Sequence, residues 1–325
     1  MVTKLTKEIT DMKKIIIALA AFASIAACNK AEVIETPEGE AISFSNPFVD
    51  NSTKAEKAED PSFNGVTKFE EFQVWGTANG VAIFNGEDVE GTVAENSVWK
   101  CAKKQYWVKD VAYKFAAVAN GSVEELNNGL PKKISYVADG VSDLVYAENL
   151  GLEDKGIIGQ AAGSNEPVEF TFAHLLAKVK FTVETNTDID GYSYEVTDIK
   201  IDNAYASGTY TVDSKEWETT SGEGQDFSTI TVDQDNKVQE CAQEKLLIPM
   251  NGVTVSYKIA LKYGSETIWQ EDKTGDNAVT ISNQELEAAN SYNFKITANV
   301  GEEITFSVEE NPTWDYNSSP SQLFL

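Results

Sequence analysis

A cysteine close to the N-terminus stands where its thiol could become a lipid attachment site. Two lysines precede an apolar run over residues 15–27, which ends in two alanines directly before Cys28. Such a pattern is typical of a secretory signal peptide, and the run is shorter than the roughly 20 apolar residues that span a bilayer. A cysteine at this site can take a diacylglyceryl thioether and acyl chains such as palmitate. We therefore expect a signal peptide over residues 1–27, with residues 1–11 as an upstream start-site extension, and a lipidated Cys28; an ordinary signal peptide with an incidental cysteine is the alternative.

A polar, acidic stretch follows the predicted lipid site. Residues 28–39 include Glu32, Glu35 and Glu38 and few apolar side chains. This composition suits a solvated tether between a membrane anchor and a folded domain. The folded part is predicted to begin near residue 40.

Residues for nucleophilic catalysis are scarce. The chain has one histidine, His174, which lies in an apolar, strand-like run over residues 170–179 without a nucleophile motif nearby. Catalysis by a Ser-His-Asp or Cys-His arrangement needs a histidine base beside a nucleophile. We expect His174 to be a packed structural residue. One histidine and three cysteines also do not form the usual zinc ligand sets, so the sequence predicts a protein that is not an enzyme and has no cofactor.

Two acidic fragments have oxygen ligands at alternate positions, as calcium loops do. The first runs over residues 186–191, but its twelfth position is Thr197, where a bidentate glutamate is required. The second, residues 233–237, ends in Lys237. Both fragments are interpreted as turns.

The charge of the chain excludes one class of partner. Lysine and arginine together number 26 against 52 acidic residues, which gives a net charge of −26, and every one of those cations is lysine. A field of this sign repels phosphate backbones, so no nucleic-acid partner is expected.

Cys101 and Cys241 are the remaining cysteines. They fall in different predicted domains, and two buried thiols are the expected state, with a disulfide between them as the alternative.

The elements that position these residues are predicted to be β-strands. Short segments rich in Val, Ile, Tyr, Phe and Thr alternate with Gly, Asn and Asp. The predicted strands are residues 72–77, 81–84, 97–100, 105–108, 113–118, 144–147, 245–250, 255–263, 292–300 and 304–308. Capping-box patterns at residues 122–125 and 282–285 predict short helical connectors, and Asn251-Gly252 predicts a type I′ turn.

About 285 residues beyond the tether exceed one usual core, so two domains are expected. A Gly-rich stretch over residues 156–166 indicates the boundary, and the domains are predicted over residues 40–166 and 167–325. Antiparallel sheets with one buried face pack as sandwiches. Their exposed edge strands can template pairing with another chain.

Six tryptophans offer rings that stack on sugars, but most lie in apolar alternation, where core packing is the ordinary role.

Several segments occur in a characteristic order: Cys28 in its lipobox, the predicted strand Ala41-Ile-Ser-Phe44, and the run from Val168 to Phe181. The order also includes Trp99 with Tyr106-Trp107, Tyr113 to Ala117, Ser291 to Phe294 and a terminal segment leading to Trp314. Taken together, these residues resemble the fimbrillin-like family of Bacteroidetes-type surface proteins. The resemblance implies two tandem transthyretin-like β-sandwich domains, export as an outer-membrane lipoprotein and polymerisation by donor-strand exchange. Implied partners are other fimbrial subunits, the outer membrane through the lipid anchor, and a host or bacterial surface ligand.

In that scheme proteolysis after a basic residue removes a first strand, which here is Ala41 to Phe48, and a donor strand fills the vacated groove. The resemblance implies that stalk subunits of the family are cleaved after an arginine during maturation. This chain has Lys54 and Lys57 in the corresponding loop instead. Either a protease accepts lysine, or the chain stays lipidated as an anchor, accessory or tip subunit. The runner-up interpretation is a monomeric surface lipoprotein that binds glycans through exposed tryptophans.

Overall fold

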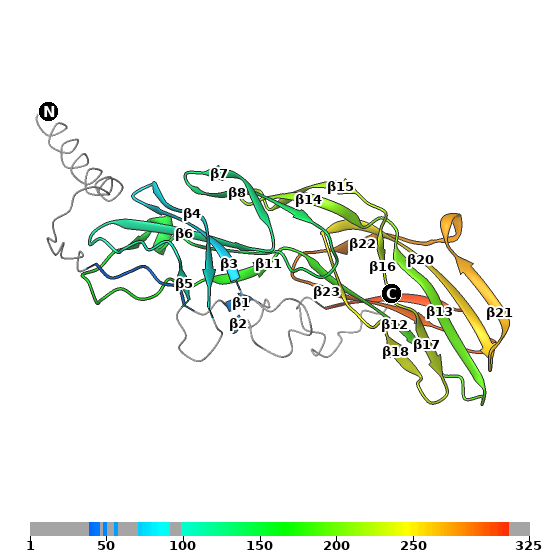
Figure 1. Cartoon of the computed structure of the whole chain (residues 1–325). Coiled ribbons are helices and arrows are strands. Elements are labelled where there is room, and N and C mark those ends of the chain that lie inside the picture. Colours follow the sequence, from blue (N-terminus) through cyan, green and yellow to red (C-terminus); the bar gives the residue numbers. More distant parts are fainter. Residues whose placement is uncertain (1–38, 46–47, 51–54, 58–70, 92–98, 312–325) are drawn as a thin grey trace, which may run out of the picture. The chain divides into compact units, whose positions relative to one another are not determined.

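The computed structural model describes residues 39–45, 48–50, 55–57, 71–91 and 99–311, all within one compact unit, Gly39–Leu325 (Figure 1). These residues form β-strands almost throughout, so the predicted all-β class is confirmed. Helical structure in the described ranges is limited to the 3₁₀ turns η2 (Leu152–Asp154) and η3 (Gly275–Asn277). No helix among them is long and apolar enough to cross a membrane.

The first sheet, here called the N-terminal sheet, has the order β2-β1-β11-β9-β6-β3-β4-β5, with β10 paired to β6. Its strands are β1 (Phe48–Asp50), β2 (Ala55–Lys57), β3 (Glu71–Ala78), β4 (Val81–Glu90), β5 (Lys100–Cys101), β6 (Ala112–Ala119), β9 (Val145–Asn149), β10 (Ile157–Ile158) and β11 (Thr171–His174). Pairing is antiparallel except between β1 and β11.

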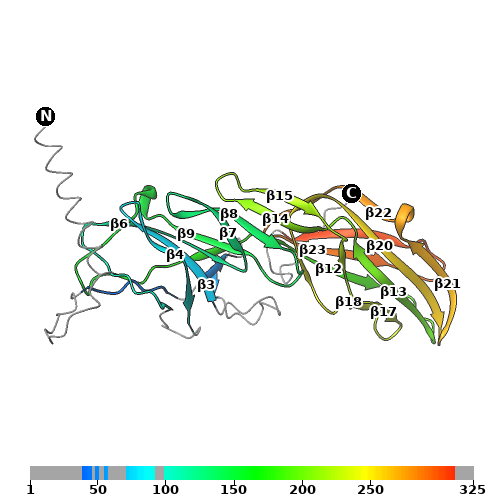
Figure 2. The ribbon, with the colours of Figure 1, turned by 45° about the horizontal axis from the view of Figure 1, so that its top comes forward.

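A second sheet, the middle sheet, has the order β15-β14-β8-β7 (Figure 2). Its strands are β7 (Ser122–Asn127), β8 (Leu130–Val137), β14 (Tyr205–Thr211) and β15 (Glu216–Ser221). The edge strands β7 and β15 are largely polar and exposed, which discourages pairing with another chain. Because β8 pairs with β14, this sheet draws strands from both sides of residue 166; the boundary there and the transthyretin-like topology stay predictions.

Two further sheets face each other in the C-terminal part. One has the order β18-β12-β23-β24, with β19 paired to β12, and the other has the order β16-β13-β20-β21, with β17 and β22 paired to β13 and β20. The strands are β12 (Ala177–Glu184), β13 (Tyr192–Ile201), β16 (Gln225–Asp226), β17 (Ile230–Asp233), β18 (Val238–Glu240), β19 (Lys245–Leu247), β20 (Met250–Tyr263), β21 (Glu266–Lys273), β22 (Val279–Leu286), β23 (Ser291–Thr297) and β24 (Thr305–Asn311). β12 and β23 run parallel, and the other pairs are antiparallel.

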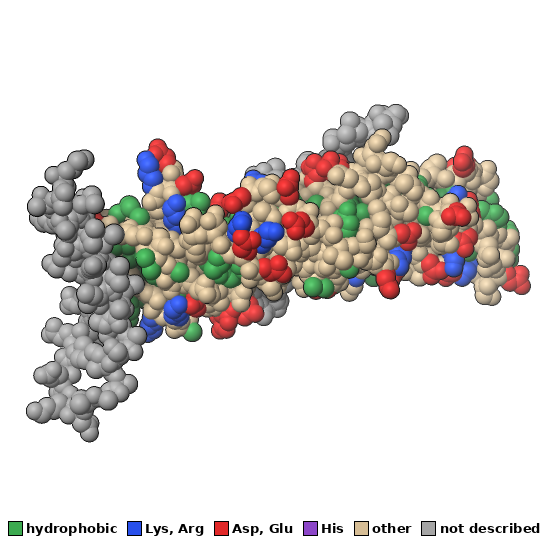
Figure 3. All heavy atoms as spheres, turned by 90° about the horizontal axis from the view of Figure 1, so that it is seen from above, with side chains coloured by type: hydrophobic (Ala, Val, Ile, Leu, Met, Phe, Trp, Pro, Cys, Tyr) green, Lys and Arg blue, Asp and Glu red, His purple; other side chains and the backbone are tan. Residues whose placement is uncertain are grey.

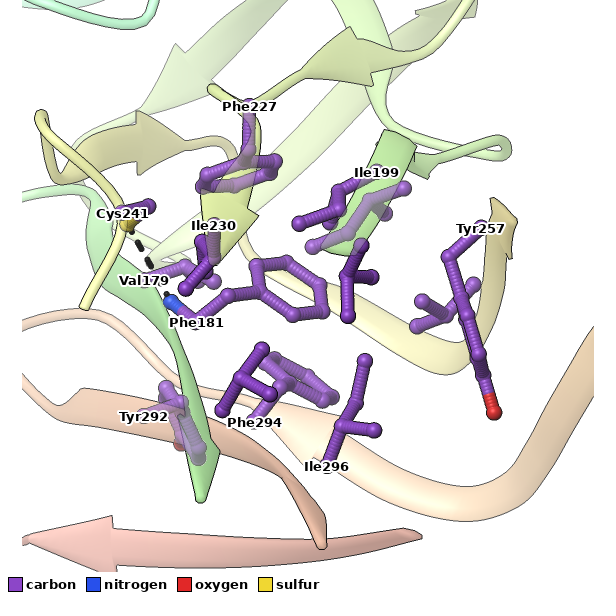
Figure 4. Packing of buried hydrophobic residues seen from close by; sticks show 14 of the residues in the cluster. Val179, Phe181, Ile199, Phe227, Ile230, Cys241, Tyr257, Tyr292, Phe294 and Ile296 are labelled. Atoms are coloured by element: carbon purple, nitrogen blue, oxygen red, sulfur yellow. Dashed lines mark hydrogen bonds between the residues drawn. The ribbon is translucent and has the colours of Figure 1, made fainter. Parts of the chain in front are cut away.

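Period-2 alternation explains how these strands make cores. In β20, Val253, Val255, Tyr257 and Ile259 are all buried and point to one side, as alternate residues of a strand must. They pack with residues of β12 and β23 such as Phe181, whose backbone N–H donates to Cys241 Sγ at 3.3 Å (Figure 4). A second core cluster, rich in aromatic residues such as Phe72 and Phe115, packs against the N-terminal sheet. A third core cluster lies under the middle sheet.

Four predictions of local structure are wrong. The segments 122–125 and 282–285 lie in strands β7 and β22 and not in helices. Asn251-Gly252 lies inside β20, where the register against β22 shifts, so Gly252 with its φ of 73° serves a bulge and not a hairpin turn. Residues 105–108 form only an isolated bridge at Tyr106.

Candidate functional site

Residues 40–45 lie in the N-terminal part as a segment that makes only isolated β-bridges; we call it the first-strand segment. Phe44 and Trp99 exchange both backbone hydrogen bonds, at 3.1 and 2.9 Å, and the Ile42 N–H donates to the Gln105 carbonyl at 2.8 Å. The segment runs antiparallel to these partners, as the bridges from Ala41 to Tyr106 and from Phe44 to Trp99 show. One edge of the segment is thereby bonded.

The opposite edge of the first-strand segment is also bonded. The Val168 N–H donates to the Ser43 carbonyl at 2.8 Å, and the Ser45 N–H donates to the Val168 carbonyl at 3.0 Å, in a parallel bridge. The segment makes isolated bridges on both edges, so its backbone is hydrogen-bonded on two sides as that of a central strand would be. Its removal would leave two unpaired backbone edges, which is the geometry that a strand from another chain can complete.

Phe44 fixes the segment in the core, since its side chain is 0% exposed. Its ring stacks on Phe170 at a centroid distance of 5.9 Å and meets Phe72 and Phe84 edge-on at 6.0 Å each. Aromatic contacts of this geometry add to the hydrophobic gain of burial. Taking Phe44 away would therefore open an aromatic-lined slot in the N-terminal core.

Glu40 ties the start of the segment to a distant loop. Its Oε2 accepts hydrogen bonds from the Asn165 side chain at 2.8 Å, from the Asn165 N–H at 3.0 Å and from the Gly163 N–H at 3.0 Å. The hydrogen bonds from Asn165 hold the pKa of the Glu40 carboxyl below its ordinary value of 4.5. No local sequence pattern could have indicated this clamp, because its partners lie more than a hundred residues further along the chain.

Of the two predicted cleavage sites, Lys57 ends the strand β2. β1 pairs in parallel with β11 and antiparallel with β2, where Phe48 lies opposite Lys57. Cleavage after Lys57 would separate β1 and the first-strand segment from the rest of the chain. Lys54 and Cys28 lie outside the described residues.

The chain's one histidine is packed inside, as expected. His174 and Asp143 are both buried, and His174 Nδ1 lies 2.6 Å from Asp143 Oδ2. No described group of three His, Cys, Asp or Glu side chains could hold a metal ion. In the second candidate calcium fragment, Asp233 Oδ1 accepts from the N–H groups of Asp235 and Asn236, as its interpretation as a turn predicts.

Both cysteines within the described residues are free thiols. Cys241 is buried, as expected, whereas Cys101 is only partly buried.

The tryptophans divide into two sets. Trp75, Trp99 and Trp107 are buried, as core packing predicts. Trp217 is half-buried and Trp269 is 41% exposed. Trp314 lies outside the described residues.

The described residues form an all-β protein in which the first-strand segment is hydrogen-bonded along both of its edges. Residues 53–312 match the sequence profile of the family described as fimbrillin-like. The chain therefore belongs to the fimbrillin-like family, which confirms the resemblance and supports a fimbrial subunit at the cell surface.

Solved structures share the fold. A fimbrial protein from Bacteroides vulgatus ATCC 8482 aligns with a TM-score of 0.52 and 16% identity, over 84% of this chain and 99% of its own. A candidate cell adhesion protein from Bacteroides ovatus ATCC 8483 aligns with a TM-score of 0.51 and 14% identity, over 86% of this chain and 99% of its own. At such identities the likeness shows the fold alone. No curated protein matches the chain.

Proposed function

We propose that the chain is a structural or adhesive subunit of a cell-surface fimbria, exported as an outer-membrane lipoprotein through Cys28 and assembled by donor-strand exchange. The slot occupied by the first-strand segment is the acceptor. Maturation after Lys54 or Lys57 frees it, and a strand of another subunit takes its place.

One observation carries this proposal. The first-strand segment is bonded along both edges and buries Phe44 completely, yet it lies near the start of the folded chain, upstream of the candidate lysines. One proteolytic cleavage is enough to release this segment, whereas releasing a strand from the middle of the chain would need a cleavage on each side of it. Its departure exposes backbone donors and acceptors together with apolar surface, and both favour a replacement strand.

The first experiment maps the N-terminus of surface-shed protein by mass spectrometry. An N-terminus at Ala55 or Ala58 supports cleavage after Lys54 or Lys57. The double substitution Lys54→Gln and Lys57→Gln should abolish that product, whereas Lys262→Gln, on β20, should leave it unchanged. A shed protein that keeps residues 40–53 would overturn maturation at these lysines.

The second experiment tests the slot directly. A synthetic peptide with the sequence of residues 40–50 should bind the cleaved chain and not the intact one. The same peptide with Phe44→Asp should fail, because a carboxylate would enter an apolar slot without a partner. Equal binding of both peptides would show that the slot is not the acceptor.

An anchor, accessory or tip role is the second form of the proposal. It is favoured by the absence of arginine from the chain. In that case purified fibres should contain the chain with acylated Cys28 and an uncut first strand. Electron microscopy of the trypsin-treated chain distinguishes the two forms, since a stalk subunit should form filaments alone and an anchor subunit should not.

A further inference from the structure

A groove runs between the middle sheet and its neighbours. Two hollows of about 490 and 780 Å³ share Tyr146, Glu148 and Val212 in their lining, so they lie next to each other. Each volume lies within the range of about 300–1,000 Å³ typical of small-molecule sites. We call the two adjoining hollows together the Trp217 groove, after the tryptophan that lines the larger one.

Trp217 is held as a flat platform in this groove. It lies on β15, and a Cβ added at Gly208 of β14 would come within 2.8 Å of the indole Cε3. The glycine therefore lets the indole rest against the strand backbone. The ring of Tyr210 supports it at a centroid distance of 5.4 Å. Because Trp217 is only half-buried and lines the groove, part of its surface remains available to a ligand.

Polar groups flank the platform. The Tyr146 hydroxyl donates to Glu148 Oε2 at 3.0 Å, which orients that carboxylate in the stretch common to both hollows. Burial, followed by the charge of Glu148, raises the pKa of Tyr146, so the hydroxyl keeps its proton. Amide side chains line both ends, with Asn79 and Asn128 in the smaller hollow and Asn251 in the larger. Amides both donate and accept hydrogen bonds, and carboxylates accept them.

The charge of the groove selects among ligands. Its lining holds two lysines, Lys114 and Lys215, and a larger set of carboxylates: Glu148, Asp213, Glu216, Glu285 and Glu287. Acidic side chains are also spread over the molecular face seen in Figure 3, with fewer lysines between them. A sulfated or carboxylated ligand would be repelled.

The strands beneath the groove disfavour an added peptide strand. β9 lies between β11 and β6, and β14 lies between β15 and β8, so neither offers a free edge there. Strand addition needs such an edge. The edge strand β15 also lines the groove, but its side chains are largely polar and exposed, which discourages pairing with another chain. The groove therefore presents side chains, and a rigid aromatic face with hydrogen-bonding carboxylate and amide groups matches a sugar ring, which has an apolar face and a rim of hydroxyls.

We propose that the Trp217 groove binds a neutral oligosaccharide, with one sugar ring stacked on Trp217 and hydroxyls bonded to Glu148 and the amides. The proposal is independent of fibre assembly, because the groove is complete in the single chain. It assigns to the subunit a class of surface ligand that it would recognise.

The test is isothermal titration of the purified chain with neutral oligosaccharides of hexose, pentose and N-acetylhexosamine units. At least one class should bind, and Trp217→Ala should weaken binding by about tenfold or more. Trp269→Ala, which removes an exposed tryptophan of β21 outside the groove, should leave the affinity unchanged. If Trp217→Ala unfolds the chain, Trp217→Leu fills more of the space and removes only the aromatic face.

A second variant tests the role of charge. Glu148→Gln removes one negative charge from the groove, so it should raise the affinity for a carboxylated form of the bound oligosaccharide while the chain stays folded. The proposal is overturned if none of the three classes of oligosaccharide binds at about millimolar concentration. It is also overturned if Trp217→Ala and Trp269→Ala weaken binding equally, or if the unaltered chain binds the carboxylated oligosaccharide as well as the neutral one. These outcomes do not depend on whether the chain assembles into fibres, because binding is measured on the single chain.

Discussion

His174 Nδ1 lies 2.6 Å from Oδ2 of Asp143, and both side chains are buried. His174 ends β11, and Asp143 lies two residues before β9, the antiparallel neighbour of β11. Leu144 and Leu175, next to the pair in sequence, pack in the core under the middle sheet. The pair therefore ties two neighbouring strands together where the N-terminal sheet meets that core.

Removing the Asp143 carboxylate should destabilise the fold. We expect Asp143→Ala to lower the free energy of unfolding by about 1–3 kcal/mol, because it removes a hydrogen-bond partner from the buried His174 ring. Asp143→Asn keeps a hydrogen-bonding side chain and should cost less. Urea unfolding followed by tryptophan fluorescence measures both.

The exposed ion pair of Lys155 and Glu153 provides the control for this series. Lys155→Ala should change stability by less than about 1 kcal/mol, since exposed pairs contribute little. Equal losses in Asp143→Ala and Lys155→Ala would show that the buried pair has no special role.

Truncating Phe44 should loosen the first-strand segment. Phe44→Ala leaves a void among the aromatic rings and should cost about 3–5 kcal/mol of stability in the N-terminal core. It should also speed trypsin cleavage at Lys57, because the segment opens more often. Ser43→Ala, a partly buried neighbour in the same segment, is the matched control and should change the cleavage rate little. Unaltered proteolysis in Phe44→Ala would mean that the ring does not hold the strand.

The clamp at Glu40 should make attachment of the first strand depend on pH. The pKa of Glu40 is lowered in the folded chain, so its contribution is fully present above the ordinary value of 4.5 and is lost as pH falls through the lowered value. Trypsin is inactive there, so hydrogen exchange of the Val168 and Trp107 amides, which bond to the segment, is the measurement.

Glu40→Gln should flatten that pH dependence, whereas Glu124→Gln, an exposed residue of β7, should leave it as it is. If the amides exchange with the same pH profile in the Glu40 variant and the unaltered chain, the clamp does not contribute.

Alternation within a strand was enough to predict much of the fold. Tyr257 and Ile259 identified β20 because burial on one face imposes a period of two. Asn251-Gly252 misled because a turn-forming dipeptide serves a bulge equally well. Residues 282–285 carry capping residues, yet their segment pairs with β20, and local chemistry contains no information about that partner.

The same limit applies to the candidate site. The pattern from Ala41 to Phe44 predicted a first strand, and the resemblance indicated that it could be removed. Phe44 bonds to Trp99, while its neighbours Ser43 and Ser45 bond to Val168, and these pairings depend on contacts between distant residues. Glu40 and Asn165 meet for the same reason, and no spacing rule connects them.

The two thiols should differ in reactivity. Burial raises the pKa of both Cys101 and Cys241, and the thiolate is the reactive form. Cys241 is in addition enclosed, with its Sγ donating to the Gln243 carbonyl at 3.2 Å, whereas Cys101 is only partly buried. Iodoacetamide at pH 8 should therefore label Cys101 at least about tenfold faster in the folded chain, and both at similar rates in urea, as read from peptide masses. Equal rates in the folded chain would contradict the burial of Cys241, and protection of both that ends on reduction would establish a disulfide.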